Sequence, residues 1–521
     1  MIPICPRRAP AALRILFLAA LAVPILLLAA PSVFAGTWGA ETNLSNTATD
    51  SETGLNHRPL IYDANGVLHV VWAEKDAPNQ NYRIYARSST AGSWSLAQLA
   101  VDYLSQDPGT NGGAKYPSLA ALPNGELDLF WHDYRIAGIN NIEIYTKTKS
   151  PGTAWSSSQA ADVRLTTTNH PETNGDNGYV PTVAALANGT LHVLWYDFRF
   201  DGNHADIFCK TRPAGGEWDL TPGDPADIRV ANDPDHSELV AVAADSPGNL
   251  HAVWRSAGSG AHVLYARRDA GTGAWSATVD VDLAGSVAGA PAIAIDGSAA
   301  AHVVWPDSRD GGRALFTRVR SAGGAWSSIA RITRPNDAAD EPSMTSQDGT
   351  IHLVWNDARV SLFNREVFHR QKATGAPWDS SGAADERISN ASGNSTRPSV
   401  AAIGGRVAVL WKDARTGNNE IFVRVRTEPA TSADVVQSLP PAELHVFPNP
   451  MRSGAQILRA AGAPATDIVI ADVRGAIRRR LPASGSVYWD GRDERGVPVP
   501  AGVYFARSAR GGGEARIVVL R

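Results

Sequence analysis

The chain contains very little cysteine, with two residues in 521. Cys5 precedes an apolar run at residues 15–30, which follows three arginines and ends near a Val-Phe-Ala sequence at 33–35. A basic start, an apolar run and a small-residue site are typical of a secretory signal peptide, so we expect residues 1–35 to be removed on export. The mature chain then keeps only Cys209, which excludes an intramolecular disulfide. Its fold must therefore rest on burial.

An excess of positive charge is also absent. The chain has 48 lysines and arginines and 52 aspartates and glutamates. Three of the arginines belong to the leader, so the mature chain has 45 basic and 52 acidic residues. Nucleic acids bind to basic protein surfaces, so we expect no nucleic-acid partner. After residue 30 no apolar run approaches the length of a membrane span, so we expect no transmembrane segment in the mature chain. The signal peptide predicts a secreted or cell-surface location.

Tryptophan, in contrast, is frequent and periodic. Fourteen of the 15 tryptophans fall into two series with a spacing of 50–64 residues. The first series is Trp72, Trp131, Trp195, Trp254, Trp305, Trp355 and Trp411, and the second is Trp38, Trp94, Trp155, Trp218, Trp275, Trp326 and Trp378. Each unit reads as four short strands joined by Gly-rich turns, without helical periodicity. This pattern predicts an all-β fold made of the blades of a β-propeller.

The two ends of the repeat region complete each other. The segment around Trp38, "TWGAETNLS", reads as a fourth strand without the three that precede it, and the last unit, at 397–426, lacks its fourth strand. An unpaired sheet edge is a liability. We therefore expect a seven-bladed propeller over residues 36–426, in which the N-terminal strand closes the last blade.

The turns between third and fourth strands carry a family resemblance. "STAGSW" (89–94), "SPGTAW" (150–155), "DAGTGAW" (269–275) and "SAGGAW" (321–326) resemble the Asp-box turn of sialidase-like, BNR-repeat propellers. The resemblance implies a propeller and, as one alternative, a sialidase-like exo-glycosidase or another carbohydrate-active hydrolase or lyase. Such a site needs an arginine cluster, a Tyr–Glu pair and an acid/base Asp, and the sequence singles out none of these. Because one fold hosts many functions, the activity stays open.

A second resemblance lies at the C-terminus. "LHVFPNPMRSG" (444–454), "IVIADVRGAIRRRL" (468–481) and "VYWDGRDERGVPVPAGVYFARS" (487–508) resemble the Ig-like domain of the flagellar hook-capping family and the sorting domains of type IX secretion. We expect a small Ig-like β-sandwich at 442–521, joined to the propeller by a Pro-rich linker at 427–441. The resemblance implies export and attachment at the cell surface.

Five blades share an Asp-x-Arg pair directly after the second-strand tryptophan. The pairs are Asp133/Arg135, Asp197/Arg199, Asp307/Arg309, Asp357/Arg359 and Asp413/Arg415. They could form a ring of charges for a ligand, or each Asp could accept local hydrogen bonds while each Arg pairs with it. A feature that recurs in most blades favours the second interpretation. Five histidines that lie three residues before the tryptophan, His69, His192, His251, His302 and His352, are interpreted as packing residues rather than metal ligands.

Function is expected where the repeat is broken. In blades two and three the middle residue of Asp-x-Arg is aromatic, and the loops at 101–116 and 166–179 are long. Aromatic rings beside charged groups suit the binding of a glycan or a peptide. The candidate ligand-binding residues are Tyr103, Tyr116, Asp133, Tyr134, Arg135, Tyr179, Asp197, Phe198 and Arg199. We expect a non-catalytic extracellular module that binds a glycan or protein, without a cofactor; a purely structural surface protein and weak calcium binding at 174–178 remain open.

Overall fold

The structure is a computed structural model of the chain. It describes the following residues: 36–55, 58–75, 81–90, 92–101, 113–134, 142–167, 180–199, 204–231, 233–258, 260–283, 288–334, 337–361, 363–427, 444–447, 451, 455–459, 467–474, 476–482, 486–508 and 514–520. Its regular structure is β, and one 3₁₀ turn, η1 (Gln159–Ala161), is the only helical segment in the described ranges. Nothing in these ranges forms a helix with the length and apolar character of a membrane span.

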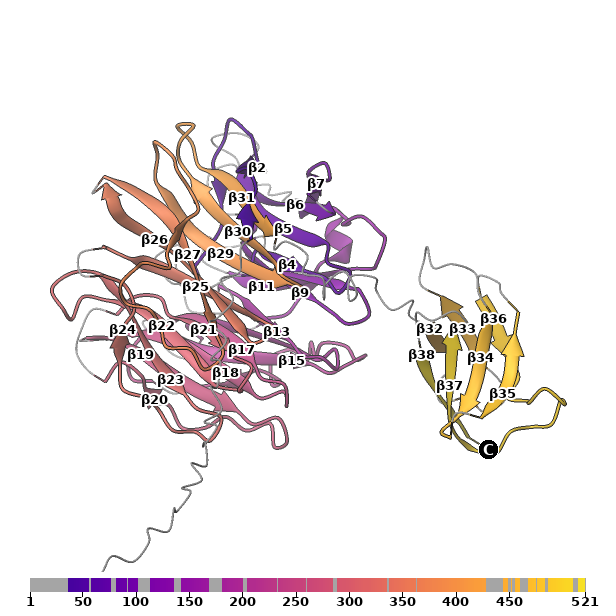
Figure 1. Ribbon diagram of the computed structural model, residues 1–521. Helices are drawn as coiled ribbons and strands as arrows, with labels where there is room; N and C mark the ends of the chain where they lie inside the picture. The colour runs from indigo at the N-terminus through magenta and orange to yellow at the C-terminus, as the bar shows by residue number, and fades with distance from the viewer. Residues whose placement is uncertain are drawn as a thin grey trace, which may run out of the picture. The chain divides into compact units, whose positions relative to one another are not determined.

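The described residues of 36–427 form seven antiparallel sheets, numbered here in chain order (Figure 1). Sheet one contains β3 (Ser51–Glu52), β4 (Leu60–Tyr62), β5 (Leu68–Lys75), β6 (Tyr82–Thr90), β7 (Ser93–Trp94) and β8 (Gln98–Val101). Sheet two contains β9 (Lys115–Ala121), β10 (Leu127–Asp133), β11 (Glu143–Lys149) and β12 (Val163–Arg164). Sheet three contains β13 (Thr182–Ala185), β14 (Leu191–Asp197), β15 (Asp206–Arg212) and β16 (Ile228–Arg229).

The remaining sheets follow the same order. Sheet four contains β17 (Ser237–Ala244), β18 (Leu250–Ala257), β19 (Ala261–Arg268) and β20 (Val279–Asp280). Sheet five contains β21 (Ala292–Ile295), β22 (Ala301–Asp307), β23 (Ala314–Arg320) and β24 (Ala330–Arg331). Sheet six contains β25 (Asp340–Gln347), β26 (Thr350–Ser361), β27 (Asn364–Ala373) and β28 (Glu386–Arg387). Sheet seven contains β29 (Ser395–Ile403), β30 (Arg406–Asp413) and β31 (Glu420–Thr427), with β1 (Thr37–Trp38) and β2 (Thr42–Asn43).

The sheets stack around a ring of first strands. Each first strand contacts the first strand of the next sheet, and β29 of sheet seven contacts β4 of sheet one. The second strands are covered on both faces, so that every residue of β14 is buried. This explains why these strands are rich in apolar residues and carry the large tryptophans. Repeated, mainly four-stranded antiparallel sheets stacked in this way are typical of a β-propeller.

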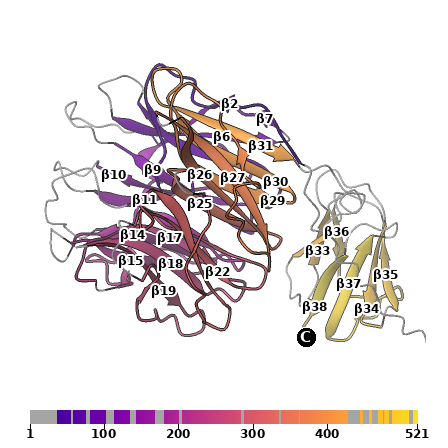
Figure 2. The same cartoon turned by 60° about the vertical axis from the view of Figure 1, so that its left-hand side comes forward.

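The N-terminal strands join the last sheet, as the sequence predicts. Trp38 pairs with Arg426 and Asn43 with Phe422, so β1 and β2 occupy the place of a fourth strand beside β31. Both views show the indigo strand β2 beside the orange strands of sheet seven (Figure 1, Figure 2). Leu44 packs with Leu60 and Trp72 of sheet one. The start of the repeat region thus completes a sheet whose other strands are more than 350 residues away in the sequence.

Two further sheets lie in the C-terminal part of the chain. One contains β32 (Leu444–Phe447), β33 (Ala455–Arg459) and β36 (Ser486–Trp489), and the other contains β34 (Ile468–Asp472), β35 (Ile477–Leu481), β37 (Gly502–Ser508) and β38 (Glu514–Val519). Ile457, Trp489, Ile470 and Ile517, from both sheets, belong to one buried cluster. These strands therefore form two layers around a common core. Most of the expected linker, residues 428–441, lies outside the described residues.

Candidate functional site

The Trp-x-Asp-x-Arg motif is a structural unit. In sheet three, Trp195 Nε1 donates to Asp197 Oδ2 over 3.1 Å, and the backbone N–H of Arg199 donates to Asp197 Oδ1 over 2.8 Å. The Arg199 guanidinium donates to the same carboxylate over 2.6 Å and lies 4.2 Å from the ring centre of Phe208. Both charged side chains are buried, at 0% and 7% exposure. The motif thus locks the end of the second strand onto the third.

The same contacts recur around the ring. Asp307, Asp357 and Asp413 each accept from their own tryptophan and from the arginine two positions on. Asp133 accepts from Trp131, while its expected partner Arg135 lies outside the described residues. In sheet four the Asp is replaced by Ser256, and the Trp254 indole N–H is buried without a hydrogen-bond partner. The geometry therefore assigns Asp133, Asp197 and Arg199 a packing role.

The five histidines before the tryptophans have local partners. His69, His251 and His302 lie 3.0–3.3 Å from Asp63, Asp245 and Asp296, each on the turn of its own hairpin. His192 Nδ1 lies 2.8 Å from the hydroxyl of Thr211. Burial lowers the pKa of His192 to about 4, so this imidazole is neutral near pH 7. These contacts agree with the packing interpretation.

The candidate aromatic residues of blades two and three divide into two groups. Tyr116 and Tyr134 are half-buried, and both rings meet the His132 ring edge-on, with centroids 4.7 and 5.2 Å away. Phe198 is only 7% exposed and packs in the core against His236. Tyr103 and Tyr179, with the calcium candidate at 174–178, lie outside the described residues. Tyr116 and Tyr134 of sheet two are therefore partly exposed to solvent, whereas Phe198 is buried in the core.

A charged cluster that the sequence reasoning missed joins sheets six, seven and one. Arg397 donates to Glu52 Oε2 over 2.6 Å and to the backbone oxygen of Thr53 over 2.7 Å. Lys412 Nζ lies 3.4 Å from the same Glu52 oxygen. The backbone N–H of Arg397 donates to Glu341 Oε2 over 2.7 Å. Two cations thus share one carboxylate at the junction of the last and first sheets.

Tyr82 connects this charged cluster to the rings of sheet two. Lys75 Nζ and Lys115 Nζ each lie 4.9 Å from the centre of its ring, and Lys115 Nζ also lies 5.9 Å from the ring centre of Tyr134. Burial, followed by the charges of Glu52 and Asp50, raises the pKa of Tyr82 above its ordinary value. Its phenol is therefore neutral. We call the following eight residues the mouth arc: Glu52, Tyr82, Lys115, Tyr116, Tyr134, Glu341, Arg397 and Lys412.

The backbone explains how the mouth arc is presented. Tyr116, Glu341 and Arg397 precede a proline at the start of a first strand, and all three have left-handed backbones with φ of 50–52°. The strand registers shift at these points, at bulges between Phe130 and His132, Asp340 and Ser343, and Thr396 and Ser399. A bulge redirects a side chain out of the regular pleat.

The sequence does contain a signal for the mouth arc. The residue after the second-strand tryptophan differs in every unit, although the tryptophan recurs in all seven and an acid follows two positions after it in six. These variable residues are Ala73, His132, Tyr196, Arg255, Pro306, Asn356 and Lys412. Of these, Lys412 belongs to the mouth arc, His132 contacts its Tyr116 ring, and Asn356 donates to its Glu341. A variable position within a constant motif indicates that the second strand ends in the same way in every blade. At this end, each blade carries a different side chain.

A cavity of about 180 Å³ is lined by residues from the first strands of six sheets. These residues include Tyr62, Thr182, Val242, Ile293, Met344 and Val400. Arg58 also lines it and donates from Nη2 to the backbone oxygen of Val242 over 3.1 Å, across the ring from sheet one to sheet four. Burial lowers the pKa of this guanidinium, although arginine stays charged at any physiological pH.

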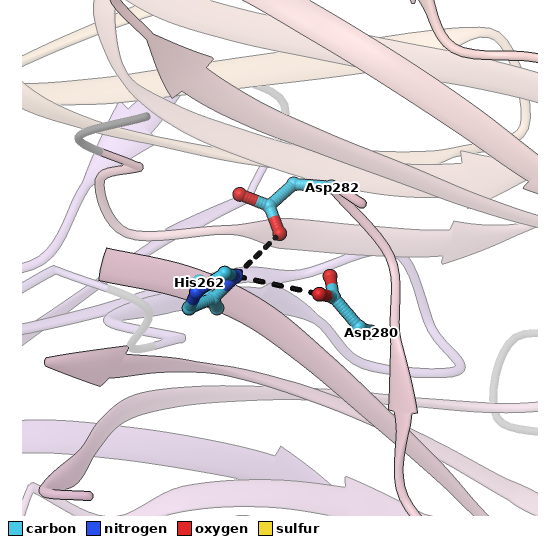
Figure 3. A group of neighbouring side chains, drawn as sticks. All are labelled: His262, Asp280 and Asp282. Atoms are coloured by element: carbon cyan, nitrogen blue, oxygen red, sulfur yellow. Dashed lines mark hydrogen bonds and ion pairs between the residues drawn. The ribbon is translucent and has the colours of Figure 1, made fainter. Parts of the chain in front are cut away.

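Among the described side chains, one group could hold a metal ion. It consists of His262, Asp280 and Asp282 in sheet four (Figure 3). The sequence reasoning weighed the histidines before the tryptophans and the segment 174–178 as metal ligands and did not identify this group.

No protein-family model matches the chain, and no curated protein matches it. Solved structures similar to it include an ulvan lyase, at 10% identity over 74% of this chain and 95% of that chain, with a TM-score of 0.46. An α-L-arabinofuranosidase of Fusarium graminearum is 12% identical over 74% and 97%, with a TM-score of 0.42. The NanB sialidase from Streptococcus pneumoniae is 11% identical over 75% and 70%, with a TM-score of 0.41. At these identities and TM-scores the likeness assigns neither a family nor an activity to this chain.

Proposed function

We propose that the protein is an exported, seven-bladed β-propeller whose mouth arc binds an extracellular glycan without catalysis. The observation that carries the proposal is the position of Tyr82, which joins tyrosine rings of sheet two to paired charges from sheets seven and one. Flat rings stack on sugar faces, while fixed charges orient hydroxyl and carboxylate groups. Lys115, Arg397 and Lys412 outnumber Glu52 and Glu341, which favours an acidic sugar.

The protonation states favour binding over catalysis. A tyrosine nucleophile needs a lowered pKa, whereas the pKa of Tyr82 is raised. Glu52 is held by Arg397 and Lys412, so its charge is already compensated.

One observation favours a carbohydrate-active hydrolase or lyase as the second candidate. Burial raises the pKa of Glu341, while Glu52 is paired with cations. Two carboxylates in different environments are the arrangement that general acid catalysis uses. Release of reducing sugar from an acidic polysaccharide, abolished by Glu341→Gln, would establish this alternative.

A test of the binding site compares two aromatic residues. The purified propeller is first screened on a glycan array, and the affinity for a retained glycan is measured by calorimetry. Tyr134→Ala is expected to weaken binding by ~1 kcal/mol or more, with little change in melting temperature, because its ring is half-exposed. Phe198→Ala is expected to destabilise the fold by about 3 kcal/mol and to leave the affinity of the folded protein unchanged. Unchanged affinity in Tyr134→Ala would place the site elsewhere.

We further propose that the two-layered domain at 442–521 is the Ig-like, sorting-type domain that the resemblance implies and that it attaches the propeller to the cell surface. Its buried cluster draws all of its described members from residues 451–519. The leader at 1–35 would direct export.

Separate cores predict separate folding. Limited proteolysis within 428–441 is expected to yield two stable fragments, near 36–427 and 442–521, each with its own cooperative melting transition. Calorimetry on the isolated fragments provides the measurement. If either fragment were unfolded alone, the two-domain proposal would be wrong.

A further inference from the structure

We propose that His262, Asp280 and Asp282 of sheet four form a Zn²⁺ site. His262 belongs to β19, Asp280 ends β20, and Asp282 follows two residues later. His262 Nδ1 lies 3.3 Å from Asp282 Oδ1 and 3.4 Å from Asp280 Oδ2, and the three potential ligand atoms all lie within 4.8 Å of one another. Figure 3 shows the imidazole facing both carboxylates.

These spacings suit zinc. Zinc binds imidazole nitrogen and carboxylate oxygen at roughly 2.0–2.2 Å in tetrahedral geometry, so neighbouring ligand atoms lie about 3.3–3.6 Å apart. The two distances from His262 fall in this range. Calcium and magnesium prefer oxygen ligands, whereas an imidazole with carboxylates suits zinc and its transition-metal neighbours. The side chains of His262 and Asp280 are 30% and 39% exposed, which leaves the fourth coordination position open to water.

Sheet four lacks the fourth-strand arginine that sheets two, three and six carry at the corresponding position. At the corresponding places, an acid on the third strand pairs with an arginine on the fourth: Glu143 with Arg164, Asp206 with Arg229, and Glu366 with Arg387. In sheet four the third-strand acid has become His262, and the arginine has become Asp280, which pairs with Leu264 as Arg229 does with Phe208. These two replacements by themselves would only reverse the direction of the ion pair.

Asp282 makes the group more than a reversed ion pair. Its counterparts in sheets two, five and six are the hydroxyl residues Thr166, Thr333 and Ser389. The Asp282 side chain is fully buried, and its Oδ2 accepts no hydrogen bond, with the Arg309 guanidinium 4.0 Å away. The Arg309 guanidinium pairs more closely with Asp307, at 2.6 Å, so two carboxylates meet at one imidazole, and a dication would neutralise both.

The test uses the mature chain after treatment with a chelator. Calorimetric titration with ZnCl₂ is expected to show one saturable site per chain, and CoCl₂ is expected to give the visible absorption bands of a tetrahedral site. His262→Ala and Asp280→Asn should each weaken Zn²⁺ binding by at least tenfold. Asp280 is partly exposed, so Asp280→Asn keeps the test valid if His262→Ala does not fold.

The matched control is His69→Ala. His69 lies 3.1 Å from Asp63 in the same kind of His–Asp pair, without a third ligand within reach among the described residues. Zn²⁺ binding should be unchanged in this variant. The proposal is overturned if the wild-type chain binds no Zn²⁺ saturably, or if His262→Ala and Asp280→Asn bind it as tightly as wild type. The site is separate from the mouth arc, so either result leaves the proposed glycan binding untouched.

Discussion

Removal of residues 37–45 is expected to lower the free energy of unfolding of the propeller by on the order of 5 kcal/mol, enough to unfold a marginal domain. The deletion exposes the edge of β31, because Gly39 N–H donates to Val425 and Leu44 N–H donates to Ile421, over 2.8 and 2.7 Å. It also removes Leu44, which is 1% exposed and packs between sheets seven and one. Chemical denaturation followed by tryptophan fluorescence gives the measurement.

Two companion variants make this result interpretable. Leu44→Ala retains the strand and should cost about 3 kcal/mol, the usual loss for a buried leucine. Removal of 442–521 should leave the stability of the propeller unchanged. If the deletion of 37–45 unfolded at the same denaturant concentration as the parent, the N-terminal strands would not close the ring.

Asp413→Ala is expected to destabilise the propeller by about 3–5 kcal/mol, because it breaks a buried charge pair from one side. Asp413 is fully buried, accepts from Trp411 Nε1 over 2.9 Å, and accepts from the Arg415 guanidinium over 2.6 Å. The substitution leaves the indole N–H without an acceptor and leaves Glu41 as the acid that pairs with Arg415. Equilibrium denaturation at neutral pH measures the loss.

The pH dependence provides a second measurement on Asp413. Burial alone would raise its pKa, but the bonds from Arg415 and Trp411 outweigh burial and lower it. The stabilisation is therefore complete above the unfolded pKa of about 4 and is lost as the pH falls through the lower folded value. Below pH ~4 the difference between Asp413→Ala and wild type should shrink.

Asp310→Ala is the surface control. Asp310 pairs with Arg331 over 3.1 Å, but its side chain is 47% exposed, so its loss should cost less than about 1 kcal/mol. Equal losses in Asp310→Ala and Asp413→Ala would contradict the structural role assigned to the motif.

Much of the fold was predictable because the repeat depends on sequence patterns that extend over only a few residues. The spacing of Trp131, Trp195 and Trp254 predicts one sheet per unit, and the structure places each tryptophan on a buried second strand. The incomplete units at the two ends predict the pairing of Trp38 with the last strand. These inferences succeed because turn residues and alternating apolar positions act over a few residues.

The candidate site was predictable only in part. Tyr116 and Tyr134 lie in the mouth arc, where the broken repeat directs attention, but Phe198 shares the motif position of Tyr134 and is buried against His236. The proposed zinc site has a sequence signal. The fourth strand of sheet four reads "VDVD" at 279–282, where other sheets read "VRLT", "IRVA", "ARIT" and "ERIS".

The sequence by itself determined the all-β class, the repeated sheet and the local pairing of Trp, Asp and Arg, because each of these depends on neighbours within one hairpin. Only the tertiary structure decided which members of the repeat meet. Glu52 lies 345 residues before Arg397, and the closing of the ring places the last sheet beside the first and gives both Arg397 and Lys412 a common carboxylate. Positions that are equivalent in the repeat are inequivalent in space, because each sheet packs against two different neighbours.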